Sequence, residues 1–330
     1  MFGMRCITKG MTFDEKASLL WDMWNSMSDP VFVGADASRF DQHTGSHALN
    51  LEHAVLETHF PKDRTLSWLL QQQHKNRMRG FTRNGHCKVG LGAMRMSGDM
   101  NTSLGNCIIS SAMIWLRLQE LGIHAYAVVD GDDSGVIMER CDLDRYLDGA
   151  QLWFLAHGYN MVLEEPVFVF EHIEFCQTKP VWVGDRWTMV RDYRKCINSD
   201  FSGYQKAGDR KYWLGLMHAI ASCGLSLCSG VPVLQAFYSW GLRHGRFQRK
   251  AKHIEMQLHG WVQMAKGVAK RPEAAVTADT RESFEKAFGI APACQVALEQ
   301  KFNTMGFAPD LEQALGTNQE IYSTSAIKLL

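Results

Sequence analysis

The stretch VVDGDDSGV, from Val128 to Val136, places three aspartates around one glycine directly after an apolar run. Like charges at this spacing repel one another, and a half-buried carboxylate without a partner costs several kcal/mol. Residues 124–138, HAYAVVDGDDSGVIM, contain two apolar strands around an Asp-Gly turn, which is a strong hairpin signal. The sequence therefore predicts a β-hairpin whose turn carries Asp132 and Asp133. It also predicts a further group that offsets the repulsion between these carboxylates.

The composition is that of an ordinary soluble globular protein. The chain has 330 residues, of which 46% are hydrophobic and 21% charged. Its 35 basic and 35 acidic side chains give a net charge of zero, so any argument for a polyanionic partner must be local. Nine cysteines without a CxxC pair suit a reducing compartment better than a secreted location.

One stretch is long enough to cross a bilayer. Residues 212–242 contain no Asp, Glu, Lys or Arg. They do contain His218, Pro232 and several serines, so two buried helices joined near residues 228–232 are expected instead of a transmembrane segment. Further helices are expected at residues 45–60, 106–122 and 143–158, and strands within 166–170 and 181–190.

A second acid ends a second predicted strand. Asp36 closes the buried stretch PVFVGAD, and if the two strands are neighbours, Asp36 and Asp132 converge at one sheet edge. Mg²⁺ is typically bound by one or two protein carboxylates with substrate phosphates and water, and such a cation would neutralise the repulsion between the acids. Two ions about 3.5–4 Å apart would activate an attacking hydroxyl and stabilise a leaving pyrophosphate oxygen. The alternative is a solvated acidic turn.

A third element is RMSGDMNTSLGN, residues 95–106. Ser97 and Gly98 form a small turn before a helix, and Thr102 and Asn106 share one helix face. The structural alternative is that Ser97 or Asp99 caps this helix. Asp41 together with an amide such as Asn106 could hydrogen-bond a sugar hydroxyl, a pairing that would favour ribonucleotides.

A block of positive charge lies between residues 74 and 95. It contains Lys75, Arg77, Arg79, Arg83, Lys88 and Arg95, with no acid between them. In isolation such a block is most often a solvated face.

These stretches together resemble a known family. DASRFDQH (36–43), RMSGDMNTSLGN (95–106), GDD (131–133) and IEFCQ (173–177) occur in the order and spacing of palm motifs A, B, C and E of positive-strand viral RNA-dependent RNA polymerases. The tombusvirus-like group is the most similar, and KGMT (9–12) and TRESFEKAFGIAP (280–292) also resemble it. A lone GDD is weak evidence, but four motifs in register are very specific.

The resemblance implies roles for individual residues. Asp36 and Asp132 would bind two catalytic Mg²⁺ ions, with Mn²⁺ as an alternative, and Asp133 would assist. Asp41, Thr102 and Asn106 would recognise the incoming ribose, and Ser97 and Gly98 would line the nucleotide and template path. Phe175, Cys176 and Gln177 would form the turn that supports the growing 3′ end.

The resemblance also implies an α+β fold, the palm and thumb of a right-hand polymerase. The palm, an antiparallel sheet with packed helices, would occupy residues 1–190 with a finger-side insertion at about 61–95, and a mostly helical thumb would occupy residues 191–330. The basic block then becomes a surface facing RNA, where cations neutralise phosphates. The expected RNA-binding residues are Arg77, Arg79, Arg83, Lys88 and Arg95, followed by Arg191, Arg194 and Lys195.

Two departures from the family pattern qualify this interpretation. Val162 stands where motif D usually offers a lysine as general acid; His157 is a substitute because its pKa lies near neutrality, or else an uninvolved surface histidine. No basic fingers region precedes motif A, so the expected partners include a missing N-terminal fingers segment or another replicase chain, besides RNA and nucleoside triphosphates.

The expected function is template-directed nucleotidyl transfer to an RNA 3′ end during viral genome replication. The alternatives are a non-catalytic palm-thumb fragment and, more remotely, a metal-dependent phosphohydrolase. The expected location is the host cytoplasm, with attachment to membrane-bound replication complexes through another segment or partner.

Overall fold

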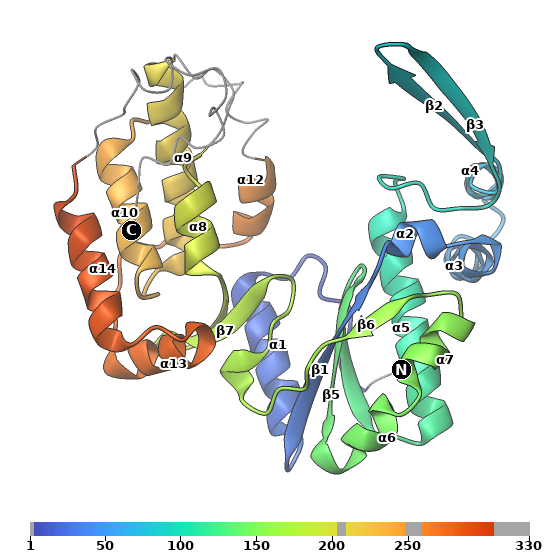
Figure 1. The fold of residues 1–330 in the computed structure, drawn as a ribbon, viewed down its shortest axis with the longest axis horizontal. Coiled ribbons are helices and arrows are strands. Elements are labelled where there is room, and N and C mark those ends of the chain that lie inside the picture. Colours follow the sequence, from blue (N-terminus) through green and yellow to red (C-terminus); the bar gives the residue numbers. More distant parts are fainter. Residues whose placement is uncertain (1–2, 203–208, 248–258, 307–330) are drawn as a thin grey trace. The chain divides into compact units, whose positions relative to one another are not determined.

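A computed structural model describes residues 3–202, 209–247 and 259–306, and its elements divide into two compact units (Figure 1). The first unit comprises Met1–Gly10 and Asp22–Val169, and the second comprises Met11–Trp21 and Phe170–Leu330. Helix α1 (Phe13–Asn25) contributes residues to both. The two compact units divide between Val169 and Phe170. The reason is that the hairpin of β7 (Thr178–Trp182) and β8 (Trp187–Arg191) belongs with the second unit, where β7 packs against α13 (Ala278–Phe288).

The first unit is built on a four-stranded antiparallel sheet. The strand order is β4-β5-β1-β6, with β1 at Pro30–Ala37, β4 at Ala125–Asp130, β5 at Asp133–Glu139 and β6 at Met161–Leu163. The predicted hairpin and the predicted strand ending at Asp36 are thus confirmed and are neighbours in the sheet. Their alternate apolar residues form a core, which includes Val31, Val33, Ala127, Val129, Val136 and Met138.

Two glycines in this sheet are needed for packing and for the turn. A Cβ at Gly135 would lie 2.2 Å from the ring of Phe32, so only glycine lets the neighbouring aromatic ring cover β5 here. Gly131, the first residue of the two-residue loop between β4 and β5, has φ 89°, which other residues rarely adopt.

Helices cover the sheet. The long helix α5 (Thr102–Leu121) ends at Gly122 with φ 61°, as expected for a C-cap glycine. Its N-cap residue is Asn101, which makes no side-chain cap bond, so capping by Ser97 or Asp99 is not observed. The single helix expected at 143–158 is interrupted at Gly149 (φ 62°) and forms α6 (Leu143–Leu147) and α7 (Ala150–Ala156), preceded by the 3₁₀ turn η1 (Arg140–Asp142).

An insertion separates β1 from α5. It contains α2 (Phe40–His43), the expected helix α3 (Ser46–His59), α4 (Arg64–Gln72), and the strands β2 (Asn76–Thr82) and β3 (Gly85–Leu91). The two strands form a sheet of their own, and Figure 1 shows this hairpin extending away from the other elements of the first unit. Apart from its partly covered base, every residue in the two strands is exposed to solvent.

The second unit is mostly helical. After η2 (Phe170–His172) and the β7–β8 hairpin come α8 (Tyr193–Ser199), α9 (Arg210–Cys228), α10 (Leu234–His244), α12 (His259–Ala265), α13, and α14 (Pro292–Thr304). The strand expected at 166–170 is reduced to one bridge between Val167 and Phe32. Within the expected thumb, residues 203–208, 248–258 and 307–330 lie outside the described residues.

The charge-free stretch 212–242 forms two helices, α9 and α10, which pack on each other, as expected. Their apolar side chains join one core with α13 and α14, including Leu225, Phe237, Trp240, Phe284 and Phe302. No helix in the described part of the chain is long and apolar enough to cross a membrane.

Candidate active site

Acidic residues gather at one end of the four-stranded sheet. Strands β1 and β5 pair from Pro30↔Glu139 to Ala35↔Ser134. Continuing this register by one residue puts Asp36 across from Asp133, with Asp132 in the adjoining turn. All three aspartates are exposed. The structure thus brings together the two strand ends that the sequence analysis placed side by side.

Asp130, the remaining acid of this stretch, has a different environment. Its carboxylate forms an ion pair with Lys9 and accepts a hydrogen bond of 3.0 Å from Thr8 Oγ1. The segment that carries these residues runs beside β4, because the Thr8 N–H donates to the Val129 carbonyl at 2.9 Å. Lys9 therefore neutralises one of the clustered acids. The sequence analysis missed this role, since no spacing rule links Lys9 to Asp130.

Helix α5 holds the acidic turn in place. The Gly131 N–H donates to Cys107 Sγ at 3.1 Å, and Ser110 Oγ donates to the Gly131 carbonyl at 2.9 Å. Burial raises the pKa of the Cys107 thiol above its ordinary value, although the Gly131 N–H partly offsets this. At neutral pH the thiol is therefore protonated and accepts this hydrogen bond as a neutral group.

Motif A and motif B residues meet at Asp41. Its carboxylate accepts hydrogen bonds from Ser97 Oγ and, at 2.8 Å, from Asn106 Nδ2. The Asn106 carbonyl oxygen is buried and has no hydrogen-bond partner within the described residues. Thr102 does not contact Asp41 through its hydroxyl, which instead donates a hydrogen bond of 3.5 Å to the Met96 carbonyl. Asp41, Ser97 and Asn106 thus form one polar cluster that can take a further hydrogen bond.

The segment expected to support a growing 3′ end forms a tight turn in the second unit. The Phe175 N–H bonds to the Thr178 carbonyl at 2.9 Å, and the Thr178 N–H bonds back at 3.1 Å. Between them Cys176 and Gln177 have φ values of 52° and 57°. Backbone strain of this kind costs roughly 1–3 kcal/mol per residue and is frequent at functional sites.

The exposed hairpin carries four of the eight basic residues expected to face RNA. Arg77 and Arg79 share one face of β2, and Lys88 lies directly across from Arg79. Phe81 follows on the same face and is 81% exposed. Arg83 lies in the connecting turn and is also exposed. One face of the hairpin therefore combines cations with an aromatic ring.

Arg95 differs from the other basic residues. Its side chain is fully buried and forms an ion pair with the equally buried Glu52. This placement contradicts the expectation that Arg95 faces RNA, since a guanidinium without solvent access cannot contact a phosphate. Sequence analysis also missed Glu52, which lies 43 residues away along the chain.

The basic residues after motif E are mixed in character. Arg191 forms two hydrogen bonds of 3.1 Å with Asp200 and lies over the Trp261 ring, so its charge already has a partner. Arg194 and Lys195 are exposed on α8.

The two candidates for a general acid can also be located. Val162 is the direct cross-strand neighbour of Asp36 and is 52% exposed. His157 Nδ1 lies 2.8 Å from the Trp153 carbonyl, and its ring stacks on Trp153 with centroids 3.9 Å apart. His157 is thus engaged at the end of its own helix.

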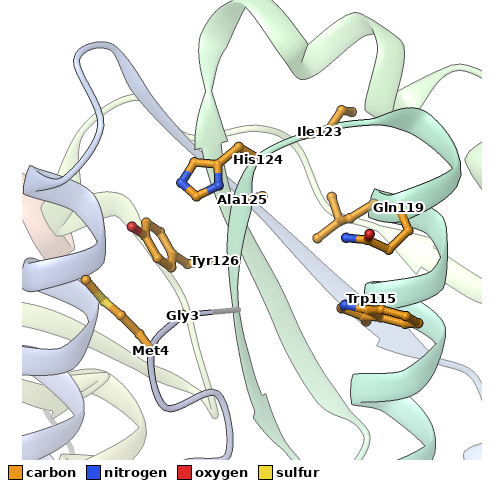
Figure 2. Close-up of a pocket in the computed structure, with 9 residues that line it drawn as sticks. Gly3, Met4, Trp115, Gln119, Ile123, His124, Ala125 and Tyr126 are labelled. Carbon is orange, nitrogen blue, oxygen red and sulfur yellow. The ribbon is translucent and has the colours of Figure 1, made fainter. Parts of the chain in front are cut away.

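A pocket of about 250 Å³ lies at the opposite end of β4 from Asp130 (Figure 2). Trp115 and Gln119 of α5 contribute to its lining, with His124, Tyr126 and Met4. It contains none of the acids described above.

The acids fit a divalent cation in the manner usual for Mg²⁺. Among the described residues, no three His, Cys, Asp or Glu side chains form a metal-binding group by themselves. Mg²⁺ seldom uses such an all-protein cage and is usually held by one or two carboxylates together with substrate phosphates. Asp36 and Asp132 supply that number of hard oxygen ligands.

Comparison with known sequences places the chain in a family. The family model described as viral RNA dependent RNA polymerase matches residues 1–308, so the chain belongs to this family. The resemblance drawn from the four motifs is confirmed.

Individual relatives give the same result. The chain is 36% identical over 306 residues to the RNA-directed RNA polymerase of Tobacco necrosis virus (strain A), covering 92% of this chain and 42% of that protein. It is 37% identical over 309 residues to the enzyme of Carnation mottle virus, covering 92% and 40%. It is 35% identical over 309 residues to the RNA-directed RNA polymerase of Tomato bushy stunt virus (strain Cherry), covering 91% of this chain and 36% of that protein. The chain thus spans less than half the length of these relatives.

Proposed function

We propose that this chain carries the catalytic centre of an RNA-directed RNA polymerase, which joins nucleoside triphosphates to an RNA 3′ end under template direction. The observation that carries the proposal is the placement of Asp36 across the sheet from Asp133 and the Asp132 turn. The names of the relatives support it. In this proposal residues 1–190 are the palm, with the finger-side insertion at about 61–95, and residues 191–330 are the thumb.

Asp36 and Asp132 are the proposed ligands of Mg²⁺, or of Mn²⁺, and Asp133 assists them. When bound, two such ions activate the 3′ hydroxyl and stabilise the leaving pyrophosphate. The chain's own contribution is rigidity. Asp36 is fixed by the pairing of β1 with both β5 and β6, and the turn is held by Cys107 and Ser110.

The cluster at Asp41 is the proposed ribose site. A 2′-hydroxyl can donate to the half-exposed Asp41 carboxylate, which Ser97 and Asn106 hold in place. A hydrogen bond to a charged group contributes about 1.5–3 kcal/mol, so the site favours a sugar whose hydroxyl donates to this carboxylate. Ser97 and Gly98 are the proposed lining of the nucleotide and template path; Gly98 has φ 91°, and a Cβ there would meet nothing within 4 Å.

The exposed hairpin β2–β3 is the proposed RNA-binding surface of the insertion. Arg77, Arg79, Arg83 and Lys88 would neutralise phosphates, and Phe81 would stack on a base. The strained turn at Cys176 and Gln177 would support the growing strand.

We also propose that the triphosphate is gripped by residues outside this chain, from an N-terminal fingers segment or a replicase partner. The greater length of the relatives supports this proposal. In this proposal the chain acts in the host cytoplasm, and the same outside segment or partner attaches it to membrane-bound replication complexes.

Primer extension on an RNA template with Mg²⁺ tests the proposed function. The chain together with the upstream segment that its longer relatives carry should extend the primer, and Asp132→Ala should abolish extension. Asp185→Ala is a matched control, because Asp185 also follows a positive-φ glycine in a hairpin turn and is 78% exposed. No extension even with that upstream segment present would favour a non-catalytic palm-thumb protein. Nucleotide hydrolysis that needs no template would favour a phosphohydrolase.

A further inference from the structure

A buried pair of opposite charges lies directly behind the loop of motif B. Glu52 of α3 and Arg95, at the start of the loop, are ion-paired, and both side chains are fully inaccessible to solvent. Two nitrogens of Arg95, Nε and Nη1, have no hydrogen-bond partner within the described residues. Glu52 is therefore the anion that stabilises this buried guanidinium, and such a pair is often no more stabilising than apolar residues of similar size.

The same glutamate also anchors the far end of the loop. The Asn101 amide donates to Glu52 Oε1 at 2.6 Å. Gln73 Nε2, at the end of α4, donates to Asn101 Oδ1 at 2.7 Å and to Asp99 Oδ2 at 3.0 Å. At the near end, the Arg95 N–H donates to the Thr44 carbonyl at 3.1 Å. Residues 96–100 are thus fixed on both sides.

Helix α5 is shaped to accept this ion pair. A Cβ at Gly105 would lie 2.4 Å from Arg95 Nη2 and 2.4 Å from the Glu52 carboxylate. The pair therefore packs on the backbone of α5 next to Asn106, whose amide bonds to Asp41. Ser97, the other donor to Asp41, lies between the two anchors of the loop.

We propose that Glu52 and Arg95 are positioning residues for ribose selection, because their ion pair holds Ser97 and Asn106 against Asp41. This inference rests on the proposed ribose site and adds to it the part of the fold that sets its geometry. Neither residue contacts the nucleotide. Their removal should loosen the loop and weaken the preference for ribose, while Mg²⁺ binding at the sheet edge stays unchanged.

The test compares equilibrium binding of ATP and 2′-deoxy-ATP to the full chain in the presence of Mg²⁺, a measurement that needs no turnover. In E52L/R95M, apolar side chains of similar size replace the pair, so folding should be retained. The preference for ATP should fall at least about tenfold, as for the loss of one hydrogen bond to a charged group. Gly105→Ala should have the same effect by displacing the pair without removing its charges.

Coupling to Ser97 separates positioning from general destabilisation. In a Ser97→Ala background, E52L/R95M should change the preference less than in wild type, because part of the effect of the pair passes through that hydroxyl. The control is R281M/E299L, which removes an ion pair with bonds of 3.0 and 2.8 Å in the second unit and should leave the preference unchanged.

A preference within about twofold of wild type in folded E52L/R95M would overturn the proposal. The proposal would also fail if the fold-changes in preference caused by E52L/R95M and by Ser97→Ala simply multiplied in the combined variant. Equal binding of both nucleotides by the wild-type chain would overturn it as well. Failure of RNA synthesis alone would overturn the proposed function and not this inference.

Discussion

Ser110 Oγ donates a 2.9 Å hydrogen bond to the Gly131 carbonyl, so the helix that begins in motif B holds the turn of motif C. Both groups are buried, and the contact crosses 21 residues of chain. Since the turn carries Asp132, this one hydroxyl influences where a proposed metal ligand lies.

Ser110→Ala should therefore lower the rate of RNA synthesis and lower the free energy of unfolding by about 1–3 kcal/mol, because the Gly131 carbonyl loses its partner. Denaturant unfolding and primer extension check the two effects. Ser239→Ala is the control, since the buried Ser239 hydroxyl has no partner within the described residues and its loss should be neutral. Equal effects of the two substitutions would contradict this role of Ser110.

The cluster at Asp41 makes a prediction about sugar choice. Asp41→Ala and Asn106→Ala should each reduce discrimination between ribo- and deoxyribonucleotides by about tenfold, because a charged hydrogen bond in the cluster is lost. The Mg²⁺ concentration that gives half-maximal activity should not change. Competitive incorporation assays measure the discrimination, with Asn198→Ala on the exposed face of α8 as a control. Unchanged discrimination would remove both residues from the ribose role.

The cationic face of the hairpin predicts the salt dependence of RNA binding. Removing three phosphate contacts by changing Arg77, Arg79 and Lys88 to Ala should make the slope of log affinity against log salt shallower by about 2, at roughly 0.7 per contact with a single strand. Filter binding over a salt series measures the slope. Lys301→Ala, on the exposed surface of α14, should leave it unchanged. A slope that stays the same in the triple variant would mean that RNA does not contact the hairpin.

Glu139 predicts a pH-dependent contribution to stability. Its carboxylate accepts the N–H groups of Ser28 at 2.7 Å and Asp29 at 2.9 Å, and these bonds lower its pKa below the ordinary value of 4.5. A carboxylate with a lowered folded-state pKa stabilises the fold above its unfolded pKa, and this stabilisation disappears as the pH falls through the folded value.

Glu139→Gln should therefore be less stable than wild type at neutral pH, and the difference should shrink below about pH 4.5. Denaturant unfolding across this pH range measures it. The exposed Glu165→Gln should show no such trend. A difference that grows on acidification would contradict the assignment.

The parts of the fold that sequence analysis predicted correctly have strong local signals. The β4–β5 hairpin has two apolar runs around an Asp-Gly turn, and β1 is an apolar run that ends in an acid. The direct hydrogen bond between Asp41 and Asn106 was not predicted, because the sequence only paired them as two groups that could hydrogen-bond one sugar hydroxyl.

The missed features lacked such signals or had conflicting ones. Asn84-Gly85 is a strong hairpin signal, but the flanking residues alternate cations with few apolar side chains and were interpreted as a charged block. The apolar periodicity continues across Asp148 and Gly149, so one helix was predicted, but Gly149 adopts φ 62° and interrupts it. The ion pair of Glu52 with Arg95 depends on tertiary packing across 43 residues, which no local pattern reveals.

The strand order of the sheet has a consequence for biosynthesis. Ala35 of β1 and Ser134 of β5, which are neighbours in the sheet, are 99 residues apart in the chain. At about 5–20 residues per second, the apolar strand β1 leaves the ribosome roughly 5–20 s before its first neighbour in the sheet has been made. During that interval its backbone can pair with other chains, so nascent protein at high concentration should depend on chaperones. The acids of the site likewise cannot meet until translation has passed β5.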